Sequence, residues 1–156
     1  MNGWDLLQNI IWAGVAALGF AILFNVPKRT LFACALSGSV AYAVRTLLTN
    51  SGYLGIEAAT LMGAAAVGFL GVPFGRRWHA PAIIFVIPGV IPLVPGALAF
   101  RTMIDLLNLT TATGGVTGDL LTVTAVNSLK TVLIVGGIAG GVAMPSLLLR
   151  RYRPMT

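Results

Sequence analysis

The chain has 156 residues, of which 57% are hydrophobic and only 9% are charged, whereas a soluble domain carries about 25% charged residues. Ten Lys and Arg residues with four Asp and Glu residues cannot cover a globular surface with ionised groups. Together with a mean hydropathy of +0.92, this composition excludes a water-soluble fold and predicts a protein of the lipid bilayer. The net charge of +6 does not indicate nucleic-acid binding, because the cations form short clusters at the ends of apolar segments rather than a basic stripe.

The first three apolar segments have the length and the low charge of membrane spans, since about 20 helical residues cross the hydrocarbon core. Residues 6–27 carry no charge and lack a basic N-terminal region, so we interpret them as a retained span rather than a signal peptide. Residues 30–49 contain only Arg45, and residues 56–75 contain only Glu57. Both charges fall near the outer ends of their spans. Snorkelling to the interface, with mutual pairing across the short loop, therefore competes with a role in coupling or gating.

The fourth segment, residues 80–107, cannot form one regular helix. Three prolines and two glycines fall within ten positions of it: Pro88, Gly89, Pro92, Pro95 and Gly96. Each interior proline removes a backbone donor and costs about 3 kcal/mol. Inside a bilayer such a break persists only where protein or a wet cavity satisfies the freed groups. The pattern predicts two half-helices, of which the second begins near Pro95 and Gly96.

A broken span of this kind is typical of transporter substrate sites, because the amides at the start of the second half-helix attract an anion. The residues predicted to bind substrate are Pro88, Gly89, Pro92, Pro95, Gly96, Ala97, Arg101, Asn127 and Lys130. Asp105 follows Arg101 by four residues on one helix face and can pair with it. Asp105 is therefore, with Arg45 and Glu57, a candidate for coupling or gating. The alternative is a kinked span that packs against its neighbours and binds nothing.

The last span, residues 119–149, combines a polar stretch with a glycine-rich stretch. Lys130 lies next to Asn127 and other polar residues. It either faces the broken helix and a ligand or ion path, or snorkels to the interface, or is a neutral amine in a packed interior. The glycines form two offset small-xxx-small pairs, Gly136 with Gly140 and Gly137 with Gly141. Such pairs let helices approach closely, either within the chain or between copies in a homo-oligomer. At about 46 Å, this segment exceeds the hydrocarbon thickness, so we expect it to tilt, to bend at the glycines or to begin later.

Together these segments predict an all-α, polytopic helical bundle with five transmembrane helices and a broken fourth helix, in one integral-membrane domain over residues 1–156. Orientation follows from the seven Lys and Arg residues at 28, 29, 76, 77, 150, 151 and 153, which five spans place on one side. The positive-inside rule then puts the N-terminus outside and the C-terminus in the cytoplasm. A re-entrant fourth segment would leave four spans and split the same cations four against three.

Enzyme and metal sites are not indicated by the sequence. There is no nucleophile elbow, no phosphate-binding loop and no His with Cys or carboxylate at ligand spacing, so we expect no catalysis, no metal and no cofactor. Cys34 is the sole cysteine and lies within an apolar run, where packing is its expected role.

Several motifs in combination resemble one transporter family. They are the stretch Gly19 to Pro27, which reads GFAILFNVP, then Arg45, then Ile87-Pro88 through Pro95-Gly96-Ala97, then the glycine-rich last span closed by Pro145 and a basic tail. This order resembles the small subunit of the threonine/serine exporter family, in the split two-gene bacterial form that is associated with succinate export. The resemblance covers nearly the whole chain.

The resemblance implies an inner-membrane, multi-pass secondary exporter of small carboxylate metabolites, such as succinate, threonine or serine. It also implies a larger multi-spanning subunit as the partner, because fused relatives carry a second half that this chain lacks. Two other functions stay open from the residues alone: an accessory subunit that stabilises a partner transporter without binding substrate, and a passive channel.

Overall fold

The computed structural model describes residues 3–111 and 118–150, and every regular element within these ranges is a helix. The elements are α1 (Gly3–Leu23), the 3-10 turn η1 (Lys28–Thr30), α2 (Leu31–Asn50), α3 (Ile56–Trp78), α4 (Ile83–Val90), the 3-10 turn η2 (Ile91–Leu93), α5 (Gly96–Thr111) and α6 (Gly118–Arg150). Four helices, α1, α2 with η1, α3 and α6, are long and apolar enough to cross a membrane, and α4 with α5 makes a fifth crossing if the bent pair is one span. The predicted all-α membrane class is confirmed.

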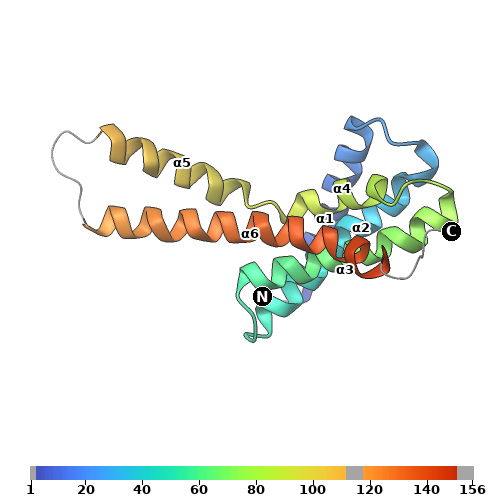
Figure 1. The fold of residues 1–156 in the computed structure, drawn as a ribbon, viewed down its shortest axis with the longest axis horizontal. Helices are drawn as coiled ribbons and strands as arrows, with labels where there is room; N and C mark the ends of the chain where they lie inside the picture. Colours follow the sequence, from blue (N-terminus) through green and yellow to red (C-terminus); the bar gives the residue numbers. More distant parts are fainter. Residues whose placement is uncertain (1–2, 112–117, 151–156) are drawn as a thin grey trace.

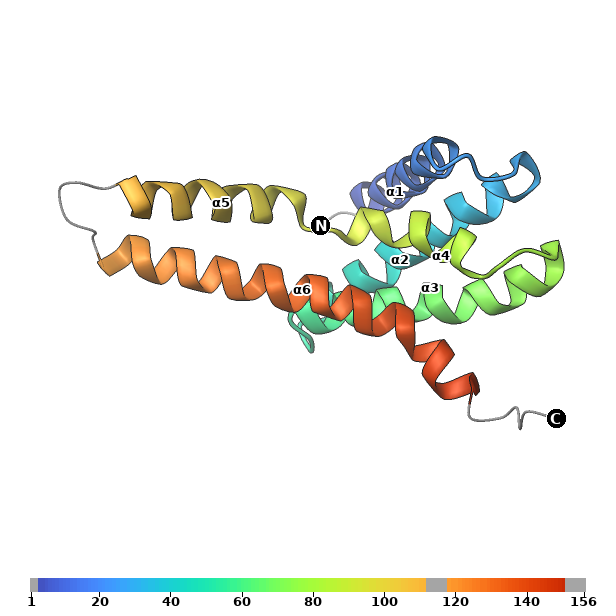
Figure 2. The ribbon, with the colours of Figure 1, turned by 45° about the horizontal axis from the view of Figure 1, so that its top comes forward.

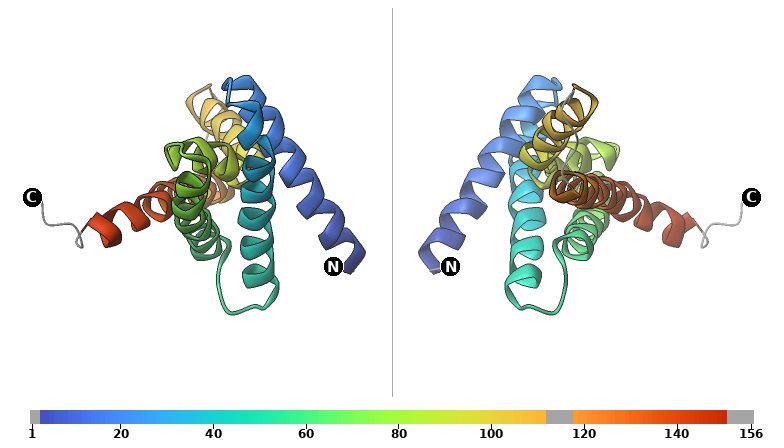
Figure 3. Two further views of the ribbon diagram at one scale, coloured as in Figure 1. Left: turned by 90° about the vertical axis from the view of Figure 1, so that its right-hand side faces the viewer. Right: turned by 90° about the vertical axis from the view of Figure 1, so that its left-hand side faces the viewer.

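The helices form a bundle and a projecting hairpin (Figure 1). In the bundle, α2 contacts α1, α3 and α4, and α3 also contacts α4 and α6. Figure 2 shows α5 and the N-terminal part of α6 extending away from the bundle side by side, with the C-terminal part of α6 lying along α3. Figure 3 looks nearly along α6 and shows α1, α2 and α3 fanned next to one another.

Small residues allow the bundle helices to approach closely. A Cβ added at Gly63 of α3 would lie 2.7 Å from the carbonyl oxygen of Ala41 in α2, and one added at Gly141 of α6 would lie 2.6 Å from the carbonyl oxygen of Leu61 in α3. Of the two glycine pairs predicted to mediate packing, Gly137 and Gly141 therefore face α3. A Cβ at Gly136 or Gly140 would meet nothing within 4 Å.

Two apolar clusters occupy the interior of the bundle. The first joins α2, α3, α4 and η2 through Ala41, Ala64, Val67, Val86, Val90 and Leu93, with α6 packed against it. The second surrounds Phe85 of α4 and includes Val26 from the α1–α2 turn and Trp78 from the end of α3. Because these two segments meet at Phe85, the basic residues at 28 and 29 and those at 76 and 77 lie at the same end of the bundle. Of the third basic cluster, Arg150 is the last residue of α6, and residues 151 and 153 fall outside the described residues.

The broken segment and the last helix differ from their predicted bounds. The second half-helix begins at Gly96, as predicted, but it continues beyond residue 107 to Thr111. The last helix begins at Gly118 and runs for 33 residues, about 50 Å at 1.5 Å per residue. It does not begin later than predicted, and it bends near its C-terminal end (Figure 2).

Candidate functional site

The candidate site is the break between α4 and α5. The first part of the segment runs from Ile83 to Leu93, the second from Gly96 to Thr111, and their axes differ by 58°. Pro88 does not end α4, since it lies inside that helix and is buried. Pro92 is at the start of the 3-10 turn, and the chain becomes extended at Val94, with φ −63° and ψ 126°. The change of direction is therefore confined to Val94 and Pro95.

Each proline leaves a carbonyl without its helical donor, and the first of these carbonyls is satisfied from α2. Pro88 cannot donate to the carbonyl oxygen of Ile84, four residues before it. The Cys34 thiol donates to that oxygen instead, with Sγ at 3.5 Å. Cys34 is fully buried, so it packs as predicted and also supplies this weak hydrogen bond.

The carbonyl of Leu93, at the break itself, is satisfied by a charged side chain of α2. Nη1 of Arg45 donates to the Leu93 carbonyl oxygen at 3.1 Å. The guanidinium carbon of Arg45 also lies 5.0 Å from the ring centroid of Tyr42, one helical turn earlier. A guanidinium has five N–H donors, so this arrangement fixes the cation beside the break and leaves further donors for a ligand. Among the described residues, no carboxylate lies within 4.0 Å of Arg45.

The start of α5 is open. A Cβ added at Gly96 would meet nothing within 4 Å, and both Gly96 and Ala97 are exposed. The amide of Gly96 donates to the Val94 carbonyl at 2.9 Å and that of Ala99 donates to the Pro95 carbonyl at 2.9 Å. Over this described stretch, the two amides between them, at positions 97 and 98, have no backbone acceptor. Such amides, at the positive end of the helix dipole, favour an anion.

The predicted site residues divide into a packed group and an open group. Pro88 and Gly89 are buried, and a Cβ at Gly89 would lie 2.7 Å from the Cβ of Ser37 in α2 and 3.0 Å from Cγ1 of Val67 in α3. The first Pro-Gly step thus allows close packing of α4, as the kinked-span alternative expects. Pro92 and Pro95 are half-buried, and the open positions follow them.

The charged candidates on α5 and α3 do not form the pairs that their spacing allows. Arg101 is exposed and Asp105 is half-buried, but within residues 3–111 and 118–150 no ion pair within 4.0 Å joins them. Glu57 lies in the first turn of α3, where a carboxylate is favoured by the helix dipole. Its Oε2 lies 2.7 Å from the position of a Cβ on Gly55, so Glu57 folds back over its own helix start, while Arg45 turns to Leu93.

The polar stretch of α6 satisfies itself along its own helix. The hydroxyl of Ser128 donates to the Thr124 carbonyl at 2.7 Å, and that of Thr131 donates to the Asn127 carbonyl at 2.8 Å. Asn127 is half-buried and Lys130 is exposed. No hydrogen bond or ion pair in the described structure brings Lys130 to the break.

Tyr42 and the partners of Arg45 and Cys34 are not predicted from the sequence. The spacing of Tyr42 and Arg45 at i and i+3 is a signal that could have suggested the ring–cation contact. The contact with Leu93 has no such local signal, since the two residues are 48 positions apart. In the described part of the chain, no three His, Cys, Asp or Glu residues cluster as metal ligands would.

Two comparisons with known proteins bear on this site. A family model described as "Threonine/Serine exporter, ThrE" matches residues 9–148, which include α2 to α5 with the break and most of α1 and α6. No solved structure matches the chain significantly.

Proposed function

This chain belongs to the threonine/serine exporter family, a family of membrane exporters, and we propose that it binds the carboxylate of its substrate at the helix break, beside Arg45. Membership of this family implies export of threonine- and serine-like compounds. The finer proposal is that the substrate is a small carboxylate metabolite, either one of these amino acids or a dicarboxylate such as succinate, carried out of the cell across the inner membrane.

The observation that carries the proposal is the hydrogen bond from Arg45 to the Leu93 carbonyl. A charged side chain within a membrane span is costly and is retained mainly for function, and Arg45 lies in the last two turns of α2. Arg45 is half-buried and is held at the break with donors to spare. A planar guanidinium binds a carboxylate through two parallel hydrogen bonds. The break begins at Leu93, so the open start of α5 is only three residues away along the chain.

This arrangement changes the roles that we propose for the charged residues. Arg45, a candidate gate on the sequence alone, becomes the principal cation of the proposed substrate site. The backbone around it is formed by Pro92, Pro95, Gly96 and Ala97. Arg101, Asn127 and Lys130 remain possible secondary contacts on the hairpin of α5 and α6. Asp105 and Glu57 remain the candidates for ion coupling.

Movement at the break can expose this site alternately to the two sides of the membrane, as in other carriers with discontinuous helices. We propose five crossings with the N-terminus outside, so that the shared basic end of the bundle faces the cytoplasm. We further propose that a larger subunit covers the projecting hairpin of α5 and α6, where the described residues of α5 bury only Thr102. An accessory subunit that binds no substrate is the competing function.

The test compares two single-cation variants of the complete transporter, Arg45→Gln and Lys130→Gln. Each removes one cation from a span, but only Arg45 lies at the break. At equal membrane levels we expect Arg45→Gln to lower carboxylate efflux from loaded proteoliposomes by about tenfold or more, because a bidentate contact is lost. Arg45→Lys should retain only part of the activity.

Efflux that is normal in Arg45→Gln and lost in Lys130→Gln would contradict the proposed site. Reconstitution of the chain with and without the larger subunit separates the two functions. If this chain binds substrate, Arg45→Gln lowers efflux by the complex. If it is purely accessory, Arg45→Gln leaves efflux by the complex unchanged.

A further inference from the structure

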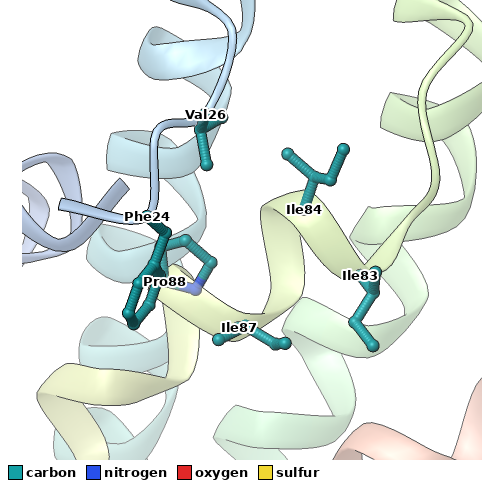
Figure 4. Close-up of a pocket in the computed structure, with 6 residues that line it drawn as sticks. All are labelled: Phe24, Val26, Ile83, Ile84, Ile87 and Pro88. Carbon is teal, nitrogen blue, oxygen red and sulfur yellow. The ribbon is translucent and has the colours of Figure 1, made fainter. Parts of the chain in front are cut away.

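We propose that the chain holds one anionic phospholipid at the turn between α1 and α2, with an acyl chain in an apolar groove and the phosphate on Lys28 and Arg29. The groove has a volume of about 350 Å³, within the range of ligand-sized pockets. Its lining residues are all apolar and come from the turn and from α4: Phe24, Val26, Ile83, Ile84, Ile87 and Pro88 (Figure 4).

The shape of the groove follows from the way α1 ends. Asn25 adopts a left-handed conformation with φ 55°. The amide of Asn25 donates to the Ile22 carbonyl at 2.9 Å, and that of Val26 donates to the Ala21 carbonyl at 3.0 Å. These are the two hydrogen bonds of a Schellman motif. Phe24 and Val26 of the turn line the groove together with residues of α4, so two side chains of the turn border it (Figure 4).

The groove opens outward rather than into the bundle. Phe24 is 49% exposed, Ile83 is 56% exposed and Ile87 is 43% exposed. Phe85, the buried neighbour between two of these isoleucines, belongs to the interior cluster instead. An open, wholly apolar groove on a membrane-spanning chain meets lipid hydrocarbon and not water, so an acyl chain is the occupant of matching chemistry.

The cations that complete the site follow the groove directly along the chain. Pro27 separates Val26 from η1, in which Lys28 and Arg29 are both exposed. No carboxylate among the described residues lies within 4.0 Å of either cation. Two uncompensated cations that follow the groove-lining Val26 by two and three residues match a lipid that has an anionic headgroup.

The position of the groove along the bundle also fits a lipid. The α1–α2 turn shares its apolar cluster with Trp78, the last residue of α3. Arg76 and Arg77, both exposed, precede Trp78. This end of the bundle therefore carries four cations and interfacial aromatic rings, the combination found at the headgroup level of a membrane.

The experiment measures lipid binding to the purified full-length chain in detergent by native mass spectrometry. Phosphatidylglycerol and phosphatidylcholine with identical acyl chains are the two probes, and glycerol phosphate is a headgroup without chains. We expect one phosphatidylglycerol to bind with high occupancy, with phosphatidylcholine at least about tenfold weaker and glycerol phosphate unbound. Equal binding of both lipids, or binding of glycerol phosphate alone, would overturn the proposal.

Two variants locate the site. Lys28→Gln with Arg29→Gln should lower phosphatidylglycerol affinity about tenfold or more, whereas the control Arg101→Gln with Lys130→Gln, which removes two exposed cations of the hairpin, should not. Equal loss in both would show general attraction to a cationic protein and refute a site. Ile83→Trp, which fills the groove from an exposed position, should also reduce lipid retention, and unchanged retention would count against the groove.

Discussion

At the scale of single residues, the main problem of this fold is what satisfies the carbonyls that lose their helical donors at the prolines and at the break. Cys34 and Arg45 supply two of the replacement donors, to Ile84 and to Leu93. They are eleven residues apart on α2, which is about three helical turns, so both project from one face. A single face of α2 thus stabilises both the proline inside α4 and the break that follows it.

The thiol contact of Cys34 can be tested by two substitutions of similar volume. Cys34→Val keeps the packing but removes the donor, so the Ile84 carbonyl is left buried without a partner. We expect the free energy of unfolding to fall by about 1 kcal/mol. Cys34→Ser keeps a donor and should be the more stable variant. Thermal unfolding in detergent measures the order, and a Val variant as stable as the Ser variant would show that packing alone explains Cys34.

Glycines at the two Pro-Gly steps are predicted to respond oppositely to a methyl group. Gly89→Ala places a Cβ against Ser37 and Val67, at 2.7 and 3.0 Å, and should destabilise the chain by about 1–3 kcal/mol through overpacking. Gly96→Ala adds its Cβ in open space and should be neutral or stabilising by up to about 1 kcal/mol. The same unfolding assay compares both. Equal destabilisation would mean that the start of α5 is as tightly packed as α4.

At the scale of elements, the sequence predicts the existence of the break well and its partners poorly. Proline chemistry is local, so Pro95 and Gly96 mark the start of α5 correctly. Pro88 remains inside α4 while Cys34, 50 positions before Ile84, donates to the Ile84 carbonyl that the proline releases. In the same way, local spacing favoured a pair of Arg45 with Glu57 across a short loop. The contact of Arg45 with Leu93 depends on how α2 and η2 pack, which no periodicity in the sequence encodes.

The packing of α6 on α3 gives an element-scale prediction from its two glycine pairs. A Cβ at Gly141 would lie 2.6 Å from the Leu61 carbonyl oxygen, while one at Gly140 would meet nothing within 4 Å. Gly141→Leu should therefore separate the helices and abolish a monodisperse peak in size-exclusion chromatography, whereas Gly140→Leu should leave the fold intact.

The control pair also reports on association between copies. If Gly140→Leu remains folded but lowers the mass measured by light scattering, then the open glycine face lies between copies of the chain. An intact fold in Gly141→Leu would contradict the close approach of α6 to α3.

At the scale of the whole molecule, the position of the projecting hairpin relative to the membrane depends on the number of crossings. α5 and the N-terminal part of α6 extend away from the bundle (Figure 2) and expose large apolar side chains such as Phe100, Met103 and Val132. Exposed apolar surface of this kind requires lipid or a protein partner. If α4 and α5 are one bent span, the C-terminal end of α5 at Thr111 lies on the opposite side of the membrane from the basic end. If they are re-entrant, it lies on the same side.

Single cysteines introduced into a Cys34→Ser background distinguish these two topologies. Ser51, Thr111 and Lys28 are all exposed, and each is replaced by Cys in turn. With right-side-out vesicles and an impermeant maleimide, five crossings predict labelling at positions 51 and 111, and labelling at position 28 only after permeabilisation. Four crossings predict that positions 51 and 111 label from opposite sides. Position 51 lies between α2 and α3 and is on the same side in either topology. The labelling of position 111 alone therefore decides whether the break lies within a complete crossing. Only in a complete crossing could a carboxylate bound beside Arg45 be reached from both sides.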